Sequence, residues 1–530
     1  MYSLVTGFLF AAMMVCGYFL HHTDTIWHTN TFPLIAGFTL LFAIPVGIAL
    51  ELLKSGGCPQ DRKVSQAGKS GQSKLRWYLL CWLFLFLSWV PVLLASWPGI
   101  FSYDCGWQLV TYVEGTVNGH HPILHTFLLG ICRDVGHALT GSNQTGALLY
   151  SLIQMLLMSG MYAYLCLFLK KQQAPKWLQI LTFVFLAFHP TNGLMALCAT
   201  KDSIFTAVFA VFLVQLLELG QEPEKFFTRI PRQAAFVVTV CFLFACRNNG
   251  FHTFLVSAPF LLWAFRRYWK RMGILLLLCL GLYGLYTGPV YKALDIEKSD
   301  PREMCSVLMQ SAARVYNMDY IGLTEEEKEA FLSIIAEEGM QSYVSWFADP
   351  VKAYFNGDKF AENPKPFLKA WISVGMRHKK MYLDAFLANT YGYWYPGDWI
   401  PENKHGKDYF EYACKDFQEN IDVEMEPKLP VLSEFYRKIG NEASFQRLPV
   451  LSATFHPAPY TWLLLFAFVL LLYRRQYSQL VLLIPLAAYF ATNLLGPIVK
   501  LRYHYPLMAC APLILYLIWK CPSLGKDEKK

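Results

Sequence analysis

The sequence predicts an all-α polytopic membrane protein with about twelve transmembrane helices and a mostly helical extracytoplasmic domain. Of its 530 residues, 55% are hydrophobic and only 16% are charged, a balance that excludes an ordinary soluble globule. Apolar runs of about 15 to 23 residues, long enough to cross the core of a bilayer, recur along the chain. The basic residues between these runs gather on one face when each run is counted as a span.

The twelve predicted spans differ in length. The first, 2–20, lacks a positive amino-terminal region and a small-residue cleavage site, so we interpret it as a retained helix and not a signal peptide. The fifth continues beyond its apolar run. The predicted spans are 2–20, 32–53, 77–97, 146–169, 177–188 with its continuation, 203–219, 233–246, 251–265, 273–291, 458–473, 480–495 and 505–519.

The basic clusters predict the orientation of the chain. Lysine and arginine favour the cytoplasmic face of a membrane. With twelve spans every cluster falls on the same face as both termini, so we expect both termini in the cytoplasm. The net charge of +8 therefore reflects orientation, and the chain contains no recognisable nucleic-acid module. The clusters lie at 54–76, 170–176, 225–232, 266–271, 474–475 and 520–530.

The spans and loops divide the chain into five parts. A transmembrane hairpin is followed by a cytoplasmic basic linker rich in glycine and serine. A transmembrane core with a long first outer loop comes next, then a polar extracytoplasmic domain and the last spans with a cytoplasmic tail. The parts are 1–53, 54–76, 77–291 with outer loop 98–145, 292–456 and 457–530.

The first outer loop predicts two juxtamembrane helices, at 104–118 and 122–140. Counting 122–140 as a span would place the Lys170 cluster outside, and the segment also contains Arg133, so we expect an interfacial helix. In 104–118 an apolar stripe recurs at helical spacing, a pattern suited either to the membrane surface or to simple packing. The stripe consists of Trp107, Val110, Val113 and Val117.

The polar segment 292–456 carries two clear patterns. Thr324 and Glu327 form a capping-box signature that predicts the start of a helix. Further on, aromatic residues crowd among turn residues in NTYGYWYPGDWIP. Such aromatics either stack on sugar faces or, more frequently, pack in a core or at a membrane interface. They are Tyr391, Tyr393, Trp394, Tyr395 and Trp399.

Five cations outside the 292–456 segment fall on the predicted outer face, against the positive-inside bias. They therefore need a local reason to be there. Four of the five stand in polar motifs at the outer ends of predicted helices, namely TKDS, RNNG and KLRYHYP. The five are Arg133, Lys201, Arg247, Lys500 and Arg502.

Further polar residues are expected at the same outer helix ends. Each alone has a structural explanation: Asp202 can pair with Lys201 or Arg247, and the adjacent asparagines can cap the next helix. Together they favour a site, because the predicted cytoplasmic loops contain nothing comparable. These residues are Asp104, Gln108, His120, His121, Asp202, Asn248, Asn249 and Tyr503.

This set of residue types suits a phosphate-containing lipid substrate. Arginine and lysine hold and neutralise a phosphate in the headgroup plane, while the apolar flank accepts a long tail. A carboxylate can take the proton of an incoming hydroxyl as the cations stabilise the departing phosphate. The residues alone therefore point to group transfer at the outer membrane surface.

The first outer loop, with its Pro-Gly, Ser-Tyr-Asp, Gln and His-His-Pro elements, resembles that of the GT-C superfamily of lipid-linked-sugar glycosyltransferases. Protein O-mannosyltransferases and aminoarabinose transferases belong to it. The mannosyltransferases carry an Asp-Glu pair where this chain has Asp104 and Cys105. The motif Arg502-Tyr503 with Pro506 is similar to the phosphate-side loop of the aminoarabinose transferases.

A closer resemblance runs from about Trp77 to the carboxyl terminus. The motifs TKDSIF, RNNG, LTEEEKE, ADPVKAYF and YGYWYP are similar to those of an uncharacterised branch of multi-spanning proteins, mostly from Gram-positive bacteria.

The GT-C resemblance implies an inverting membrane glycosyltransferase, a hexosyltransferase, with Asp104 as catalytic base. The donor would be a polyprenyl-phosphate-linked sugar and the acceptor a cell-envelope glycan, lipid or protein. Lys201, Arg247 and Arg502 would bind the donor phosphate. The residues expected to position the substrates are Gln108, His120, His121, Asp202, Asn248, Asn249 and Tyr503.

Two alternative functions stay open at the level of sequence. A lipid-linked glycan polymerase or ligase would use the same outward chemistry. A transporter or flippase of envelope glycolipids also suits twelve spans, but transporters place ionisable residues near the midplane and show repeat symmetry, which this chain lacks. A divalent metal stays open as a cofactor, although no tight ligand spacing occurs and no metal ligand is assigned.

Overall fold

The computed structural model describes residues 1–54, 71–397, 409–414 and 422–520. Within those ranges the chain is helical, and its β contacts are isolated bridges only. The structure is that of a polytopic helical membrane protein: among the described residues, seven helices are long and apolar enough to cross a membrane, or eight if the bent pair α7 and α8 is one span. These seven or eight are fewer than the twelve predicted.

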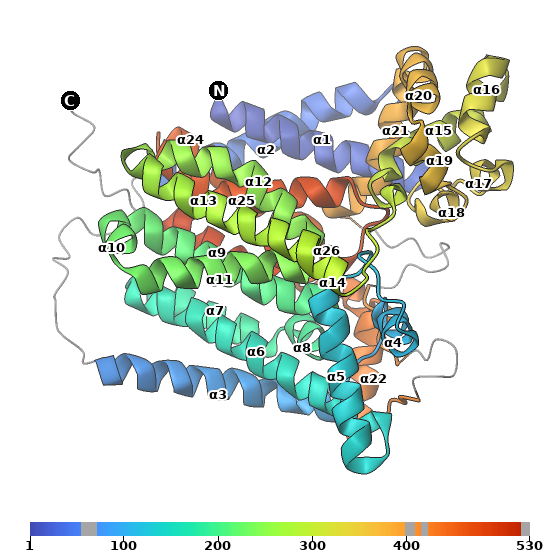
Figure 1. Cartoon of the computed structure of the whole chain (residues 1–530). Helices are drawn as coiled ribbons and strands as arrows, with labels where there is room; N and C mark the ends of the chain where they lie inside the picture. The colour runs from blue at the N-terminus through green and yellow to red at the C-terminus, as the bar shows by residue number, and fades with distance from the viewer. Residues whose placement is uncertain (55–70, 398–408, 415–421, 521–530) are drawn as a thin grey trace.

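Every predicted apolar run nevertheless forms a helix, and these helices lie side by side in one bundle (Figure 1). A 49° bend separates α7 from α8, directly before Pro190, whose ring cannot continue the α7 hydrogen-bond ladder. The bundle helices are α1 (Tyr2–Thr23), α2 (Thr31–Leu53), α3 (Gly71–Ala95), α6 (Asn143–Lys171), α7 (Lys176–Phe188), α8 (Pro190–Leu197), α9 (Lys201–Gln221), α11 (Ile230–Cys246), α12 (Asn248–Ala264), α13 (Trp269–Leu285), α24 (Pro457–Tyr473), α25 (Tyr477–Leu494) and α26 (Leu501–Trp519).

One end of the bundle carries the basic turns. Arg474, after α24, donates hydrogen bonds to the carbonyl oxygens of Leu53 and Lys520 at the ends of α2 and α26. Lys171 at the end of α6 lies 3.8 Å from Glu218 near the end of α9. The short helix α10 (Pro223–Thr228) lies at this end too (Figure 1). We call it the basic end.

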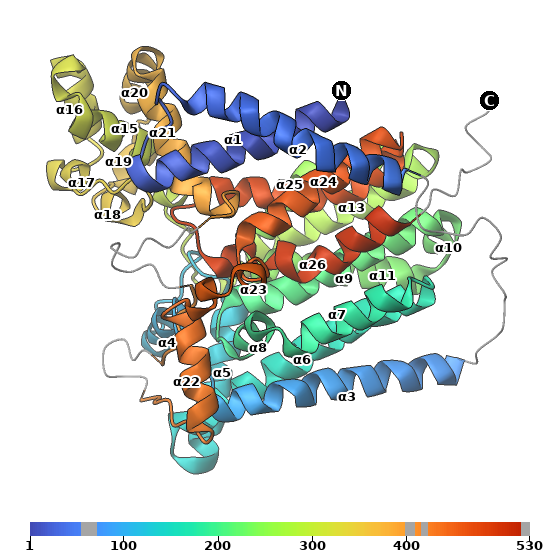
Figure 2. The ribbon, with the colours of Figure 1, turned by 180° about the vertical axis from the view of Figure 1, so that it is seen from behind.

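The opposite end carries the loop 98–145 and most of the 292–456 segment (Figures 1 and 2). We call it the domain end. Apart from the 18-residue α5, its helices are short, and most run across the direction of the bundle. They are α4 (Cys105–Glu114), α5 (Ile123–Thr140), α14 (Tyr291–Ala293), α15 (Ser306–Met318), α16 (Glu325–Leu332), α17 (Glu337–Gln341), α18 (Asp349–Lys352), α19 (Gly357–Glu362), α20 (Lys365–Arg377), α21 (Lys379–Thr390), α22 (Pro430–Gly440) and α23 (Pro449–Ser452).

The two helices predicted in the first outer loop both form, as α4 and α5. Helix α4 ends earlier than the predicted 118, because Gly115 adopts a left-handed conformation (φ 69°) that closes the helix. The predicted apolar stripe is split between two environments: Trp107 and Val113 are exposed, whereas Val110 is buried. Packing therefore accounts for Val110, whereas Trp107 and Val113 are not packed in the core.

The polar segment has a hydrophobic core of its own, which includes Met309, Phe331 and Phe367. The predicted capping box at Thr324 and Glu327 is confirmed, since each side chain accepts a hydrogen bond from the other residue's backbone N–H. These features support a separately packed helical unit within 292–456.

The aromatic cluster after α21 packs inside the protein. Tyr391, Tyr393, Trp394 and Tyr395 are all buried in the main core of the bundle. The packing interpretation thus holds for these four rings, and none of them offers an open face to a sugar. Trp399 lies outside the described residues.

The loop between α1 and α2 docks onto the polar segment (Figure 2). Asp384 accepts hydrogen bonds from the Thr25 hydroxyl (2.7 Å) and the Ile26 N–H (3.1 Å). Arg314 pairs with Asp384 and donates to the carbonyl oxygen of Asp24 at 2.7 Å. The amino-terminal hairpin is therefore fixed to the domain end by buried polar contacts.

Helix α5 depends on a small residue in α6 for its position. A Cβ atom at Gly146 would lie 2.5 Å from the Cα of Arg133, a backbone atom that cannot move without shifting α5. We predict that Gly146→Ala lowers the free energy of unfolding by about 1–3 kcal/mol through overpacking. Thermal unfolding in detergent measures this effect.

Gly281→Ala on α13 is the control, because nothing lies within 4 Å of its Cβ position. The control should unfold at or above the wild-type temperature. Equal behaviour of the two variants would contradict close packing of α5 on α6.

Candidate active site

Two backbone hydrogen bonds hold the loop 98–145 beside the start of α9. The Ile100 N–H donates to the carbonyl oxygen of Leu197 at 3.0 Å, and the Ala199 N–H donates to that of Ile100 at 2.8 Å. Ile100 and Cys198 thereby form a parallel bridge. This pairing places Asp104, four residues after Ile100, next to Lys201.

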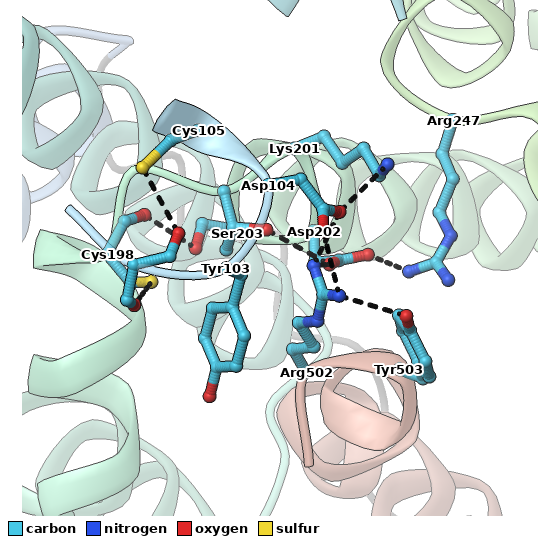
Figure 3. Close-up of polar contacts among 12 residues, drawn as sticks. Tyr103, Asp104, Cys105, Cys198, Lys201, Asp202, Ser203, Arg247, Arg502 and Tyr503 are labelled. Atoms are coloured by element: carbon cyan, nitrogen blue, oxygen red, sulfur yellow. Dashed lines mark hydrogen bonds and ion pairs between the residues drawn. The ribbon is translucent and has the colours of Figure 1, made fainter. Parts of the chain in front are cut away.

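Asp104 lies between two cations (Figure 3). Its carboxylate oxygen Oδ2 is 2.9 Å from Arg502 Nη1 and 3.2 Å from Lys201 Nζ. Although Asp104 is the N-cap residue of α4, its side chain makes no capping hydrogen bond. The side chain is 31% exposed, so a ligand can reach the carboxylate.

Asp202, in the first turn of α9, is the second carboxylate of the cluster and is fully buried. It forms an ion pair with Arg247, at the junction of α11 and α12. Its other oxygen accepts from the Thr200 hydroxyl at 3.1 Å and lies 3.5 Å from Arg502 Nη1. Arg502 thus bridges the two carboxylates, and we call Asp104, Lys201, Asp202, Arg247 and Arg502 the charged cluster.

Two tyrosine rings flank the guanidinium groups. The Tyr503 ring centre lies 4.7 Å from the guanidinium carbons of both Arg247 and Arg502, and its hydroxyl accepts from Arg502 Nη2 at 2.9 Å. The Tyr103 ring lies 4.4 Å from Arg502. Cation–π contacts of this kind orient the guanidinium planes.

The cations decide the protonation state of Asp104. Burial raises the pKa of its carboxyl group, but Arg502 and Lys201 outweigh that effect and hold the pKa well below its usual range. Asp104 is therefore a carboxylate at neutral pH, and removal of either cation would make it more basic.

The two adjacent histidines face different partners. His121 Nδ1 accepts from Lys201 Nζ at 3.0 Å, and burial together with Lys201 lowers the pKa of His121 to about 2. His121 is thus neutral, with its remaining proton on Nε2. His120 is 43% exposed and its Nδ1 lies 3.7 Å from Glu303 of the polar segment. Only His121 joins the charged cluster.

The structure places three other predicted site residues differently. Gln108 is 1% exposed, and its amide group hydrogen-bonds to Thr126 and His125, so it packs α4 onto α5. Asn249 accepts from Arg247 Nε at 3.3 Å and donates to Thr492, which makes it a support for Arg247. Asn248 is exposed at the start of α12.

The donor set does not fit a metal ion. Within the described residues, no group of three or more His, Cys, Asp or Glu side chains is arranged to hold one. Asp104 and Asp202 are already neutralised by cations, which would repel a divalent metal. We therefore derive no chemistry through a metal.

Comparison with known proteins identifies the family. Residues 113–530, well over half of the chain, match a family of unknown function, DUF6020. The chain belongs to the DUF6020 family. No curated protein matches it, and no solved structure does. The match covers Lys201, Asp202, Arg247 and Arg502, whereas Asp104 precedes it.

Sequence reasoning missed Tyr103 in this DUF6020 chain. Its ring flanks Arg502, and its backbone N–H donates to the carboxylate of Glu411 at 2.8 Å. Tyr103 directly precedes Asp104, and this position could have identified it as a candidate site residue. The partner Glu411 gave no such signal, because it lies 308 residues further along the chain.

The burial of the two carboxylates separates their roles in this DUF6020 protein. We predict that Asp202→Ala lowers the free energy of unfolding by about 3–5 kcal/mol, because it leaves Arg247 buried without its main partner. Asp104→Ala should cost clearly less, since water reaches the 31% exposed site. Thermal unfolding of both variants in detergent compares them. Equal losses would make Asp104 a structural residue.

Proposed function

We propose that this protein is an inverting membrane glycosyltransferase of the GT-C type. It transfers a sugar, as a hexosyltransferase does, from a polyprenyl-phosphate donor to a cell-envelope glycan, lipid or protein acceptor. In this proposal the chain has twelve spans and cytoplasmic termini. The domain end faces outward, so the reaction occurs on the outer face of the cell membrane.

The observation that carries the proposal is the position of Asp104. A partly exposed carboxylate between Lys201 and Arg502, with Arg247 close by, combines a base and a phosphate clamp within one cluster. All of these groups stand at helix ends on the domain end of the bundle, and the proposal puts the lipid phosphate at that end.

The proposed reaction needs only groups that this cluster contains. The acceptor hydroxyl loses its proton to Asp104 as its oxygen attacks the anomeric carbon of the donor sugar. The bond from that carbon to the phosphate oxygen breaks, and the bonding pair leaves with the polyprenyl phosphate. Lys201, Arg247 and Arg502 stabilise the charge on that leaving group. Attack from the face opposite the phosphate inverts the anomeric configuration.

Donor binding would also activate the base. Lys201 and Arg502 now bind Asp104, and the arriving phosphate competes for the same two cations. Every hydrogen bond that a cation redirects to the phosphate removes stabilisation from the Asp104 carboxylate. The pKa of Asp104 then rises toward its ordinary value, and its basicity increases only once the donor is present.

The charge distribution favours this proposal over transport. Transporters place ionisable groups near the membrane midplane, whereas Lys201, Arg247 and Arg502 lie at helix ends. A lipid-linked glycan polymerase or ligase would use the same cluster with a diphosphate-linked donor. The choice of donor in the assay below separates these two enzymes.

Replacement of Asp104 tests the proposal directly. We predict that Asp104→Asn lowers the transfer rate at least about 10²-fold, because the amide cannot accept the proton. Release of polyprenyl phosphate is measured in liposomes, with a panel of polyprenyl-phosphate sugars and a cell-envelope extract as acceptor. The matched control Asp134→Asn, an aspartate on α5 that is 50% exposed, should keep full activity.

Full activity in Asp104→Asn would remove Asp104 from the mechanism. Release only from diphosphate-linked glycans would favour the polymerase or ligase, and no release from any donor would favour transport.

The acid limb of the pH profile is a second test. The base must be ionised, so kcat/KM for the donor falls only as the pH falls through the pKa of Asp104 in the free enzyme. Lys201 and Arg502 hold that pKa low, and wild-type activity should persist well into acid. Lys201→Gln removes one cation and should move the acid limb to higher pH. An unmoved limb would show that another group titrates.

A further inference from the structure

A short non-helical segment of the polar region, residues 409–414, is anchored beside the start of the loop 98–145. The Tyr409 hydroxyl hydrogen-bonds to Thr191 of α8 at 2.8 Å, and the Tyr412 hydroxyl donates to the Ala95 carbonyl oxygen at the end of α3, also at 2.8 Å. Tyr409 is completely buried and Tyr412 is 5% exposed. The segment is therefore held in place on both sides of residue 411.

Between these anchors Glu411 makes a two-way contact with Tyr103. The Tyr103 N–H donates to Glu411 Oε2 at 2.8 Å, and the Glu411 N–H donates to the Tyr103 hydroxyl at 2.8 Å. Glu411 thus holds both the backbone and the ring of Tyr103. We call this pair the Tyr103–Glu411 clamp.

The clamp acts at a backbone position that needs support. Tyr103 has a φ of 60°, in the left-handed region, where a tyrosine is unfavourable without compensating contacts. This conformation directs the chain into α4 at the next residue, Asp104. A Tyr103 released from Glu411 would relax toward ordinary backbone angles and move the Asp104 carboxylate.

The same clamp also fixes the main cation partner of Asp104. The Tyr103 ring, whose hydroxyl accepts from the Glu411 N–H, lies 4.4 Å from the guanidinium carbon of Arg502. Arg502 in turn donates to Asp104 at 2.9 Å. Figure 3 shows the Tyr103 ring beside Arg502, with the Asp104 carboxylate above the Arg502 guanidinium group. The base and its partner are thus oriented through one tyrosine.

We propose that Glu411 is a positioning residue for Asp104, acting through Tyr103. The inference rests on the proposed function, and it assigns the polar segment a part in assembling the site. Glu411 needs an acceptor oxygen for this role and not a negative charge. Its larger effect falls on the catalytic step, because Asp104 directly follows Tyr103, whereas Arg247, paired with Asp202, still binds the phosphate when Arg502 shifts.

Three variants test this role: Glu411→Ala removes the acceptor, Glu411→Gln keeps an acceptor without the charge, and Glu434→Ala is the control. Glu434 is an exposed carboxylate on α22 that pairs with Arg437 of the same helix. Each variant is assayed for kcat and for binding of polyprenyl phosphate. Hydrogen–deuterium exchange of the peptide covering residues 99–106 reports on the Tyr103 N–H without any need for activity.

We expect Glu411→Ala to lower kcat about 10²-fold, as misplacement of a reacting group does, and to weaken binding of polyprenyl phosphate by a smaller factor, because of the clamp's contacts only Arg502 is a phosphate ligand. Exchange at residues 99–106 should become faster in this variant. Glu411→Gln should recover most of the kcat and of the exchange protection, and Glu434→Ala should match the wild type. Wild-type kcat and exchange in Glu411→Ala would overturn the inference, as would a Glu411→Gln variant as impaired as Glu411→Ala.

Failure of the proposed function is distinguishable from failure of this inference. A wild-type protein without transfer activity contradicts the proposed function. Hydrogen–deuterium exchange then tests, without any activity, whether the Tyr103–Glu411 clamp holds the loop. Faster exchange at residues 99–106 in Glu411→Ala still supports positioning of Asp104, whereas unchanged exchange overturns it.

Discussion

The burial of one carboxylate organises the domain end of this protein. Asp202 has no exposed surface, and a charge removed from water needs cations and hydrogen bonds to remain ionised. Arg247 and Arg502 supply the charge and Thr200 a hydrogen bond. Because Asp202 lies in the first turn of α9, Arg247 joins α11 to α12 and Arg502 lies in the first turn of α26, this single requirement draws four helix ends together.

The same convergence of helix ends leaves one more cation than carboxylate in the charged cluster. Arg502 also reaches Asp104, and Lys201 approaches Asp104 from the other side, so three cations face two carboxylates. With His121 neutral, the cluster favours an incoming anion. Asp202 is enclosed within the ion-pair network, whereas the side chain of Asp104, the base in the proposed reaction, is 31% exposed.

The sequence was enough to predict the helices of the bundle but only part of the candidate site. Length and apolarity predict the helices of the bundle, because those are the properties a membrane selects, although seven or eight of the described helices, and not twelve, are long and apolar enough to span. Lys201, Arg247 and Arg502 were predictable from their conflict with the positive-inside bias. Gln108 was predicted to join these cations, but its side chain packs α4 onto α5. The direction in which a helix turns its side chains depends on tertiary contacts that the sequence does not reveal. Glu411 lay beyond prediction, because its role depends on one long-range hydrogen bond to Tyr103.

Direct binding of polyprenyl phosphate tests the central claim, that the charged cluster is an anion site and not only an ion-pair network. Wild type, Arg247→Gln and the exposed-surface control Arg437→Gln are compared in liposomes, after thermal unfolding has confirmed that each is folded. The account predicts saturable binding in wild type and control, and binding weakened at least about tenfold in Arg247→Gln, since hydrogen bonds to charged groups contribute about 1.5–3 kcal/mol. Equal binding by all three proteins, or none by the wild type, would contradict it.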